Sequence, residues 1–308
     1  QAPVAVVPTP NPPLTLVPRS EQRSAQVYIM ETLKAFQERL ILSGGVTRNW
    51  VNIDNYTAAS GTWSKQKTMA DTKQYGVIVR PIPWVSAYYG YNENFDAQFV
   101  RLGAVQPDGS VIDAGAAPPR QSVSHEFGVK LTRDDGRLSA SVAHFDTDLT
   151  NRTRVIVGTP YQELQSGGNY TGWESDIFYR PTDSISLIAT YSYTDATDTN
   201  GNQIEAVAPR TLSGLVRYDF RKGLLKGLGV SLAANYQSEY VLANGSVNYT
   251  VEPRTLVDAG LFYTWKDYKF QLNVNNLTDK KYIAGGFLPQ RVYIGTPRNI
   301  RCAVTYTW

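Results

Sequence analysis

The sequence predicts an all-β fold, a transmembrane antiparallel up-and-down β-barrel, on three observations. Segments of alternating polarity follow one another, short turns alternate with long polar loops, and aromatic residues gather near strand ends. The chain has 308 residues, of which 42% are apolar and 20 are tyrosine. Tyrosine is typical of half-buried pleated surfaces, because its ring can be buried while its hydroxyl stays in water.

The alternation of polarity is clearest in the C-terminal half. In residues 228–236 one side carries Leu, Val, Leu, Ala and Tyr, and the other carries Gly, Ser, Ala and Asn. Successive side chains of a strand point to opposite sides, so each such strand has an apolar and a polar face. Lipid strongly disfavours charges, so charged residues indicate the lumen side. The expected lumen side carries Glu126 with Lys130, Glu174 with Asp176, and Arg217 with Asp219.

The connections alternate between two lengths. Tight turns are expected at 80–83, 133–136, 180–183, 221–227 and 266–267. Long loops are expected at 51–71, 95–120, 151–167, 195–206, 241–252 and 278–295. Outer-membrane barrels have short turns at the periplasmic end and long loops at the extracellular end. A soluble sheet sandwich rarely has so many loops longer than about 12 residues.

These connections separate about thirteen strands. They are expected near 25–35, 38–50, 72–80, 84–94, 121–132, 137–148, 168–180, 184–195, 207–220, 228–240, 253–265, 267–277 and 296–308. Single-chain bacterial barrels close with an even number, so an odd count suggests that strands are missing or miscounted. Residues 28–42 are ambiguous, because Ile29, Leu33, Phe36 and Leu40 are also spaced as on one face of a helix.

Composition excludes several other classes of protein. One cysteine, Cys302, excludes internal disulfides and multi-cysteine zinc sites. With two histidines and a net charge of +3, neither a histidine-rich metal centre nor a nucleic-acid partner is expected, and no cofactor is predicted. No run of about 18 apolar residues occurs, which excludes a membrane-spanning helix but not membrane-spanning strands.

The C-terminal region carries a specific set of motifs. Residues 274–282 read Val-Asn-Asn-Leu-Thr-Asp-Lys-Lys-Tyr, Gly-Thr-Pro-Arg follows at 295–298, and an alternating strand ends at Trp308. This end of the chain resembles the C-terminus of TonB-dependent outer-membrane receptors, above all the ferric-siderophore branch. Segments 75–89, 208–211 and 257–260 are similar to further strands of that branch. The resemblance covers residues 25–308, and it favours strand, turn and strand over a helix in residues 25–50.

The resemblance implies a receptor of the bacterial outer membrane that imports a ferric siderophore or similar chelate, driven by a TonB-type energy-coupling protein. Such receptors are 22-stranded barrels filled by an N-terminal plug. Dividing 308 residues among 22 strands leaves about 14 residues for each strand and its connection, too few for the long loops. We therefore expect residues 1–24 to be a Pro-rich loop or linker. Residues 25–308 would be the C-terminal part of the barrel, without the plug that reaches the partner.

The resemblance also implies that ligand is caught at the outer mouth of the lumen. The candidate ligand-binding residues, chosen by their places near long-loop ends, are Trp63, Tyr91, Phe95, Tyr193 and Tyr240. For each of them the more common alternative is a place in an aromatic girdle at the membrane interface. Tyr306 and Trp308 resemble the C-terminal aromatic signal read by the barrel-assembly machinery, and they equally suit a last strand that faces outer-membrane lipid.

Three alternatives remain open on the sequence. A complete smaller barrel would act as a passive porin, and a receptor of the same family could carry cobalamin or a glycan instead of a siderophore. An outer-membrane hydrolase would need His125 with Ser124, or His144 with Ser141, as base and nucleophile. Neither pair has a recognisable orienting group, so no enzymatic activity is expected.

Overall fold

The computed structural model describes residues 19–308 except 58–61, 157, 166, 244–247 and 288–290. One antiparallel sheet of thirteen strands dominates it, and each strand pairs with its neighbours in chain order. The strands are β1 (Arg19–Ala35), β2 (Leu40–Thr57), β3 (Thr62–Ile82), β4 (Val85–Asp96), β7 (Arg120–Thr132), β8 (Leu138–Thr150), β11 (Gly168–Thr182), β12 (Ile185–Asp198), β13 (Arg210–Asp219), β14 (Leu228–Gln237), β17 (Arg254–Trp265), β18 (Tyr268–Asn275) and β21 (Asn299–Tyr306). The predicted number and order of strands are confirmed.

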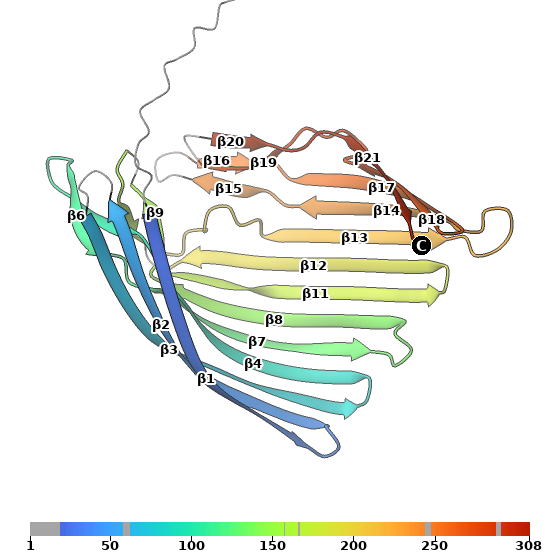
Figure 1. The fold of residues 1–308 in the computed structure, drawn as a ribbon, viewed down its shortest axis with the longest axis horizontal. Coiled ribbons are helices and arrows are strands. Elements are labelled where there is room, and N and C mark those ends of the chain that lie inside the picture. Colours follow the sequence, from blue (N-terminus) through green and yellow to red (C-terminus); the bar gives the residue numbers. More distant parts are fainter. Residues whose placement is uncertain (1–18, 58–61, 157, 166, 244–247, 288–290) are drawn as a thin grey trace, which may run out of the picture.

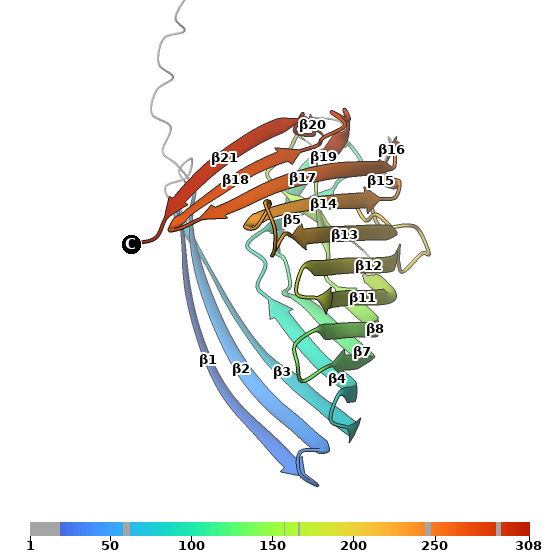
Figure 2. The same ribbon diagram turned by 90° about the vertical axis from the view of Figure 1, so that its right-hand side faces the viewer.

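The sheet curves into a trough whose two edges are β1 and β21 (Figures 1 and 2). Within the described residues neither edge strand pairs on its outer side. The first strand starts at Arg19, earlier than the expected residue 25, and residues 1–18 of the predicted loop or linker lie outside the described part. No helix in that part is long and apolar enough to cross a membrane.

The ambiguous segment 28–42 is two strands joined by a tight turn, as the resemblance predicts. β1 and β2 pair without a break from Arg19 opposite Tyr56 to Ala35 opposite Leu40. The turn places Phe36, Gln37 and Glu38 at φ angles of 53°, 58° and 64°. Three consecutive residues in the left-handed region cannot continue a right-handed helix. Residues 28–42 therefore do not form a helix, although their apolar residues have helical spacing.

The register separates an apolar face from a polar face across the whole sheet. Adjacent rows that cross five strands, β13, β14, β17, β18 and β21, show the difference. The apolar row is Val216, Leu232, Ala259, Val274 and Ile300. The next row is Arg217, Ser231, Gly260, Asn273 and Arg301. Because the side-chain period is two, successive residues of every strand alternate between these two faces.

The apolar face carries two belts of aromatic side chains, with aliphatic residues between them. The belt nearer the long loops includes Tyr75, Tyr89, Tyr91, Phe127, Trp173, Tyr191 and Tyr193. The belt nearer the short turns includes Trp84, Tyr179, Tyr218, Tyr263, Trp265, Tyr268 and Tyr306. Two aromatic belts at the borders of an apolar band are typical of a sheet that crosses a lipid bilayer.

Short turns lie at one end of the sheet and all the long connections at the other (Figure 1). The long connections form three further small sheets. Their strands are β5 (Arg101–Val105), β6 (Val111–Ala116), β9 (Thr153–Val155), β10 (Gln162–Leu164), β15 (Tyr240–Ala243), β16 (Asn248–Val251), β19 (Ile283–Phe287) and β20 (Arg291–Ile294). The predicted asymmetry between the two ends is confirmed. The long loop expected at 51–71 is wrong, because β2 continues to Thr57 and β3 begins at Thr62, so that most of this segment is paired strand.

Gly172 in β11 allows two strands and a side chain to meet on the polar face. A Cβ atom there would collide with the backbone oxygen of Tyr193 and would lie 2.9 Å from the ring of Phe145. We expect Gly172→Ala to lower the free energy of unfolding by about 1–3 kcal/mol, because overpacking forces the backbone to shift. The measurement is urea unfolding of the native protein in lipid vesicles. Gly90→Ala is the matched control, since nothing lies within 4 Å of its Cβ position; an equal loss in both variants would contradict the packing argument.

Candidate ligand site at the long-loop end

Two long connections fold together over the polar face of the β2–β3 hairpin. Gln66 in β3 donates from Nε2 to the carbonyl oxygen of Ala117 at 3.2 Å. Gln98, only 6% exposed, donates from Nε2 to the carbonyl oxygens of Pro118 at 2.8 Å and Asn151 at 2.6 Å. This side chain therefore joins the connection after β4 to the connection after β8. Because Gln98 is buried and its hydrogen bonds are satisfied, it holds the two connections together.

The hairpin of β5 and β6 within the first of these connections is closed by an ion pair. Arg101 donates from Nε to Asp113 Oδ2 at 2.5 Å, and Asp113 Oδ1 accepts the N–H of Gly115 at 2.7 Å. The hydrogen bond from Arg101 and then that from Gly115 lower the pKa of Asp113 below its ordinary value. The ion pair that closes the hairpin therefore persists to a lower pH than it would with a carboxyl of ordinary pKa.

An apolar cluster fastens the connection after β4 to the sheet. Val51 and Ile53 lie on the polar face of β2, and Ile53 is fully buried. Ala97 completes the buried cluster and Phe95 packs against it. Burial under the connection removes these two apolar residues of the polar face from water.

Beside this cluster is a cavity of about 330 Å³. The residues that line it are Gln22, Ser24, Ala25, Gln26, Asn49, Trp50, Val51, Phe95, Asp96, Ala97 and Phe99. They combine two phenylalanine rings with amide and hydroxyl groups from β1 and β2. Small-molecule sites combine apolar walls with a few polar groups in this way. The cavity lies at the long-loop end, so it is our candidate ligand site.

The structure separates the predicted ligand residues. Phe95 lines the cavity, and among the side chains that the structure describes Tyr91, Tyr193 and Tyr240 do not. Tyr240 is 5% exposed and packs with Leu242 and Val251 inside the β15–β16 hairpin. Trp63 lies in β3 opposite Tyr56, and its side chain is outside the described part of the structure.

Tyr91 and Tyr193 lie on the apolar face, in the belt nearer the long loops. The ring of Tyr91 stacks on Tyr75 with centroids 4.4 Å apart, and its hydroxyl donates to Glu93 Oε1 at 2.5 Å. The guanidinium of Arg210 lies 5.9 Å from the centre of the Tyr193 ring. These contacts fit the girdle alternative, in which the ring meets lipid and the hydroxyl or a neighbouring charge meets water.

A second polar group occupies the middle of the polar face and surrounds a cavity of about 400 Å³. Tyr88 donates to Glu126 Oε1 at 2.5 Å, and Lys130 lies over the Tyr88 ring at 4.9 Å. Glu174 and Asp176 line the same cavity, and Ser141 donates to Asp176. The charged residues expected on the lumen side are therefore together on one face, as the alternation predicts.

The two histidines do not form a hydrolase site. His125 faces the apolar side, where its Nδ1 is 2.8 Å from the Tyr89 hydroxyl, while Ser124 faces the other side and bonds to Thr147. His144 packs between Phe127 and Trp173, and Ser141 faces away from it. Within the described residues no group of three or more His, Cys, Asp or Glu side chains could hold a metal ion.

The motif at residues 274–282 folds the connection between β18 and β19 around Asn276. This residue is 4% exposed and has a φ of 51°. Its N–H donates to Asp258 Oδ1 at 2.8 Å, and its side-chain amide donates to the carbonyl oxygens of Lys280 at 2.9 Å and Thr296 at 3.2 Å. Its Oδ1 accepts the N–H of Lys280 at 2.9 Å. The motif therefore has a structural role, because the hydrogen bonds of Asn276 hold the connection against β17.

Tyr306 and Trp308 lie at the short-turn end of the last strand. Tyr306 contacts Tyr268 with ring centroids 4.9 Å apart and so belongs to the second aromatic belt. Trp308 is 99% exposed, with its ring 6.4 Å from that of Tyr306. Both rings are accessible from outside the sheet, as a surface signal or a lipid contact requires.

Comparisons of this chain with protein families and with individual proteins agree with each other. A family model described as "TonB dependent receptor-like, beta-barrel" matches residues 2–277. The metal-pseudopaline receptor of Pseudomonas aeruginosa (strain UCBPP-PA14) is 27% identical over 256 residues, which cover 80% of this chain and 35% of that protein. The ferrichrome outer membrane transporter/phage receptor of Escherichia coli K12 is 24% identical, covering 93% of this chain and 38% of that protein.

Among solved structures, the ferripyoverdine receptor of the outer membrane of Pseudomonas aeruginosa, bound to ferripyoverdine, superposes with a TM-score of 0.76. Its sequence is 20% identical, and the match covers 93% of this chain and 39% of that one. This likeness shows the fold. The chain spans less than two fifths of the length of the two relatives named above.

We expect Asn276→Ala to lower the free energy of unfolding by about 1–3 kcal/mol, because it leaves buried hydrogen-bond partners unsatisfied. It should also increase cleavage of residues 277–287 by protease added to whole cells. Asn273→Ala is the control, since its side chain forms no hydrogen bond among the described residues. Unchanged stability and cleavage in Asn276→Ala would show that Asn276 does not organise this connection.

Proposed function

Because the chain belongs to the TonB-dependent receptor-like β-barrel family, we propose that it forms the C-terminal part of a receptor that imports a ferric siderophore. The protein is located in the bacterial outer membrane, where this family resides. Residues 25–308 would form part of the wall of a 22-stranded barrel, and the Pro-rich start would be an extracellular loop or linker. The relatives named for ferrichrome and ferripyoverdine support a ferric chelate as the class of cargo.

The observation that carries the proposal is the cavity beside Phe95 and Phe99. It lies on the polar side of the sheet, at the long-loop end, where the outer mouth of a barrel would be. Aromatic rings provide apolar contact to the planar parts of a chelate, and amides from Gln22, Gln26 and Asn49 provide hydrogen bonds. Phe95 is therefore the predicted ligand residue that we retain, and Phe99 is added to it.

Transport would depend on parts of the receptor that reach an energy-coupling protein of the TonB type. A plug domain inside the barrel would pack against the polar face. The charged and hydroxyl groups around Glu126, Lys130 and Asp176 provide hydrogen bonds for such a polar neighbour. The open edges at β1 and β21 support the same view, because lipid does not tolerate unpaired strand edges.

The exposed rings of Tyr306 and Trp308 would serve as the signal for the barrel-assembly machinery.

A second candidate function is uptake of a chelate of another metal, which the likeness to the metal-pseudopaline receptor favours. The two functions share the same chemistry at the mouth, since both require capture of a metal chelate rather than a free ion. They differ only in the cargo.

The proposed function is tested by uptake of radioactive iron in cells that express the native receptor as their sole outer-membrane siderophore transporter. The probes are ferrichrome, ferrioxamine B and ferripyoverdine loaded with iron-55. We expect uptake of at least one of them that requires the energy-coupling protein. Uptake of a glycan or of cobalamin, with no uptake of any ferric siderophore, would contradict the assignment.

For the transported chelate we expect Phe95→Ala to weaken binding to whole cells about tenfold, which corresponds to the loss of one buried aromatic contact. Tyr191→Ala is the matched control, because Tyr191 lies in the aromatic belt on the opposite face. Equal affinities in the wild type and Phe95→Ala would remove the cavity from the binding site while leaving the transport function standing.

A further inference from the structure

A shallow pocket of about 520 Å³ lies on the apolar face at the short-turn end of β4, β7 and β8. Trp84, Arg133, Asp134, Asp135 and Leu138 line it. Leu138 pairs with Tyr179 of the second aromatic belt, and Trp84 is 50% exposed. The pocket therefore has an apolar wall at the height of this belt and a charged rim formed by the turn between β7 and β8.

The charges on the rim are only partly satisfied. Arg133 Nη2 lies 2.8 Å from Asp135 Oδ2, and Asp135 Oδ1 accepts the N–H of Arg137 at 3.0 Å. The Arg133 side chain is 58% exposed, and a guanidinium has five N–H donors, so several of them remain available. Asp134 forms no hydrogen bond or ion pair among the described residues. The rim thus offers one cationic donor group and one unpaired carboxylate.

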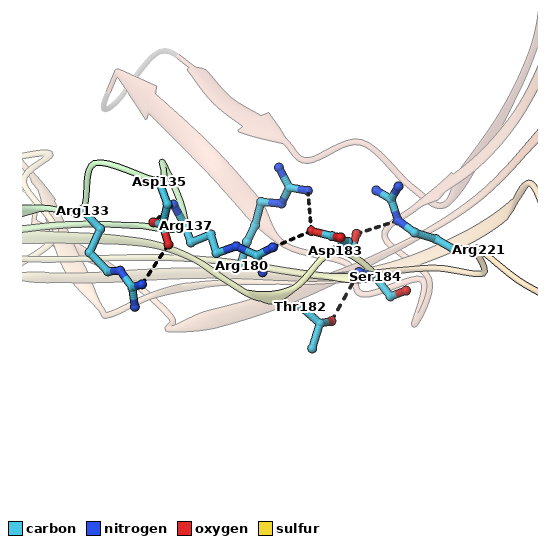
Figure 3. Close-up of polar contacts among 8 residues, drawn as sticks. All are labelled: Arg133, Asp135, Arg137, Arg180, Thr182, Asp183, Ser184 and Arg221. Carbon is cyan, nitrogen blue, oxygen red and sulfur yellow. Dashed lines mark hydrogen bonds and ion pairs between the residues drawn. The ribbon is translucent and has the colours of Figure 1, made fainter.

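The neighbouring arginines do not line this pocket. They gather around Asp183 instead (Figure 3). Arg137 and Arg180 approach Asp183 Oδ1 at 2.8 and 4.0 Å, and Arg221 donates from Nε to the Asp183 carbonyl oxygen at 2.9 Å. Arg133 extends away from this group. The charge at the pocket is therefore that of Arg133, Asp134 and Asp135, with one positive and two negative groups.

We propose that this pocket binds the headgroup of a phosphatidylethanolamine molecule in the periplasmic leaflet. The lipid phosphate accepts hydrogen bonds from Arg133, and its primary ammonium donates to Asp134. The glycerol and the first methylenes of the acyl chains lie against Trp84 and Leu138. Short turns mark the periplasmic end of an outer-membrane barrel, which gives the leaflet. The proposal depends on the membrane location of the protein and not on its cargo.

Charge complementarity favours a zwitterionic lipid with a primary amine over other lipids. An anionic headgroup such as phosphatidylglycerol would satisfy Arg133 but would add a third negative charge to those of Asp134 and Asp135, without an ammonium group to offset it. Phosphatidylcholine carries a cation without N–H donors, so it cannot form the hydrogen bond to Asp134. Phosphatidylethanolamine satisfies both groups at once.

The test uses the native receptor, purified from the outer membrane in mild detergent, with native mass spectrometry. Phosphatidylethanolamine and phosphatidylglycerol of identical acyl chains are added in equal amounts. We expect the wild type to retain the former at least about threefold better. In Asp134→Asn the preference should fall to about one, and Arg133→Gln should retain both lipids several-fold less. Asp267→Asn, in the turn between β17 and β18, is the control and should behave as the wild type.

Heat-dependent mobility on gels shows whether each variant is folded, and only folded variants are compared. Equal retention of the two lipids by the wild type would overturn the proposal. So would a preference that survives in Asp134→Asn, because the carboxylate would then have no part in selection. A second measurement does not depend on these variants. The fluorescence of Trp84 is obtained as the difference between the wild type and Trp84→Phe, and brominated phosphatidylethanolamine should quench it about twofold more than brominated phosphatidylglycerol. Equal quenching by the two lipids would also refute the site.

Discussion

The whole structure depends on one constraint, the pairing of backbone N–H and C=O groups between neighbouring strands. In lipid an unpaired backbone group costs several kcal/mol, so a sheet in a membrane must pair every strand. The thirteen strands meet this requirement in an unbroken antiparallel order from β1 to β21. Only these two edge strands lack a second partner within the described residues. This arrangement is what we expect of the proposed C-terminal part of a larger closed wall.

The same pairing determines the chemistry of both faces. Because neighbouring strands stay in register, each position is apolar or polar across several strands, as the row through Val216 and the adjacent row through Arg217 show. The apolar row meets lipid, and the polar row meets water or protein. The long connections are outside the bilayer, where this rule does not apply. They form their own small sheets, and one of them covers Val51 and Ile53 to create the candidate ligand site.

Much of the fold was predictable because its signals are local. Strand alternation, tight turns and aromatic belts each arise from residues close in sequence, and the structure confirms them. The turn at Phe36–Glu38 has no glycine, so composition alone could not separate it from a helix. The candidate site was harder to predict, because residues far apart in sequence form it. Gln98 ties two separate connections together, and no local pattern distinguishes Phe95 in the cavity from Tyr91 in the girdle.

The proposed function requires further strands to complete this sheet. The most direct test is the intact mass of the native polypeptide extracted from the outer membrane, with sequencing of its peptides. We expect a mass well above 34.2 kDa and peptides that precede Gln1. A native mass equal to that of this chain would contradict it, because β1 and β21 would then have to close a smaller barrel by pairing with each other.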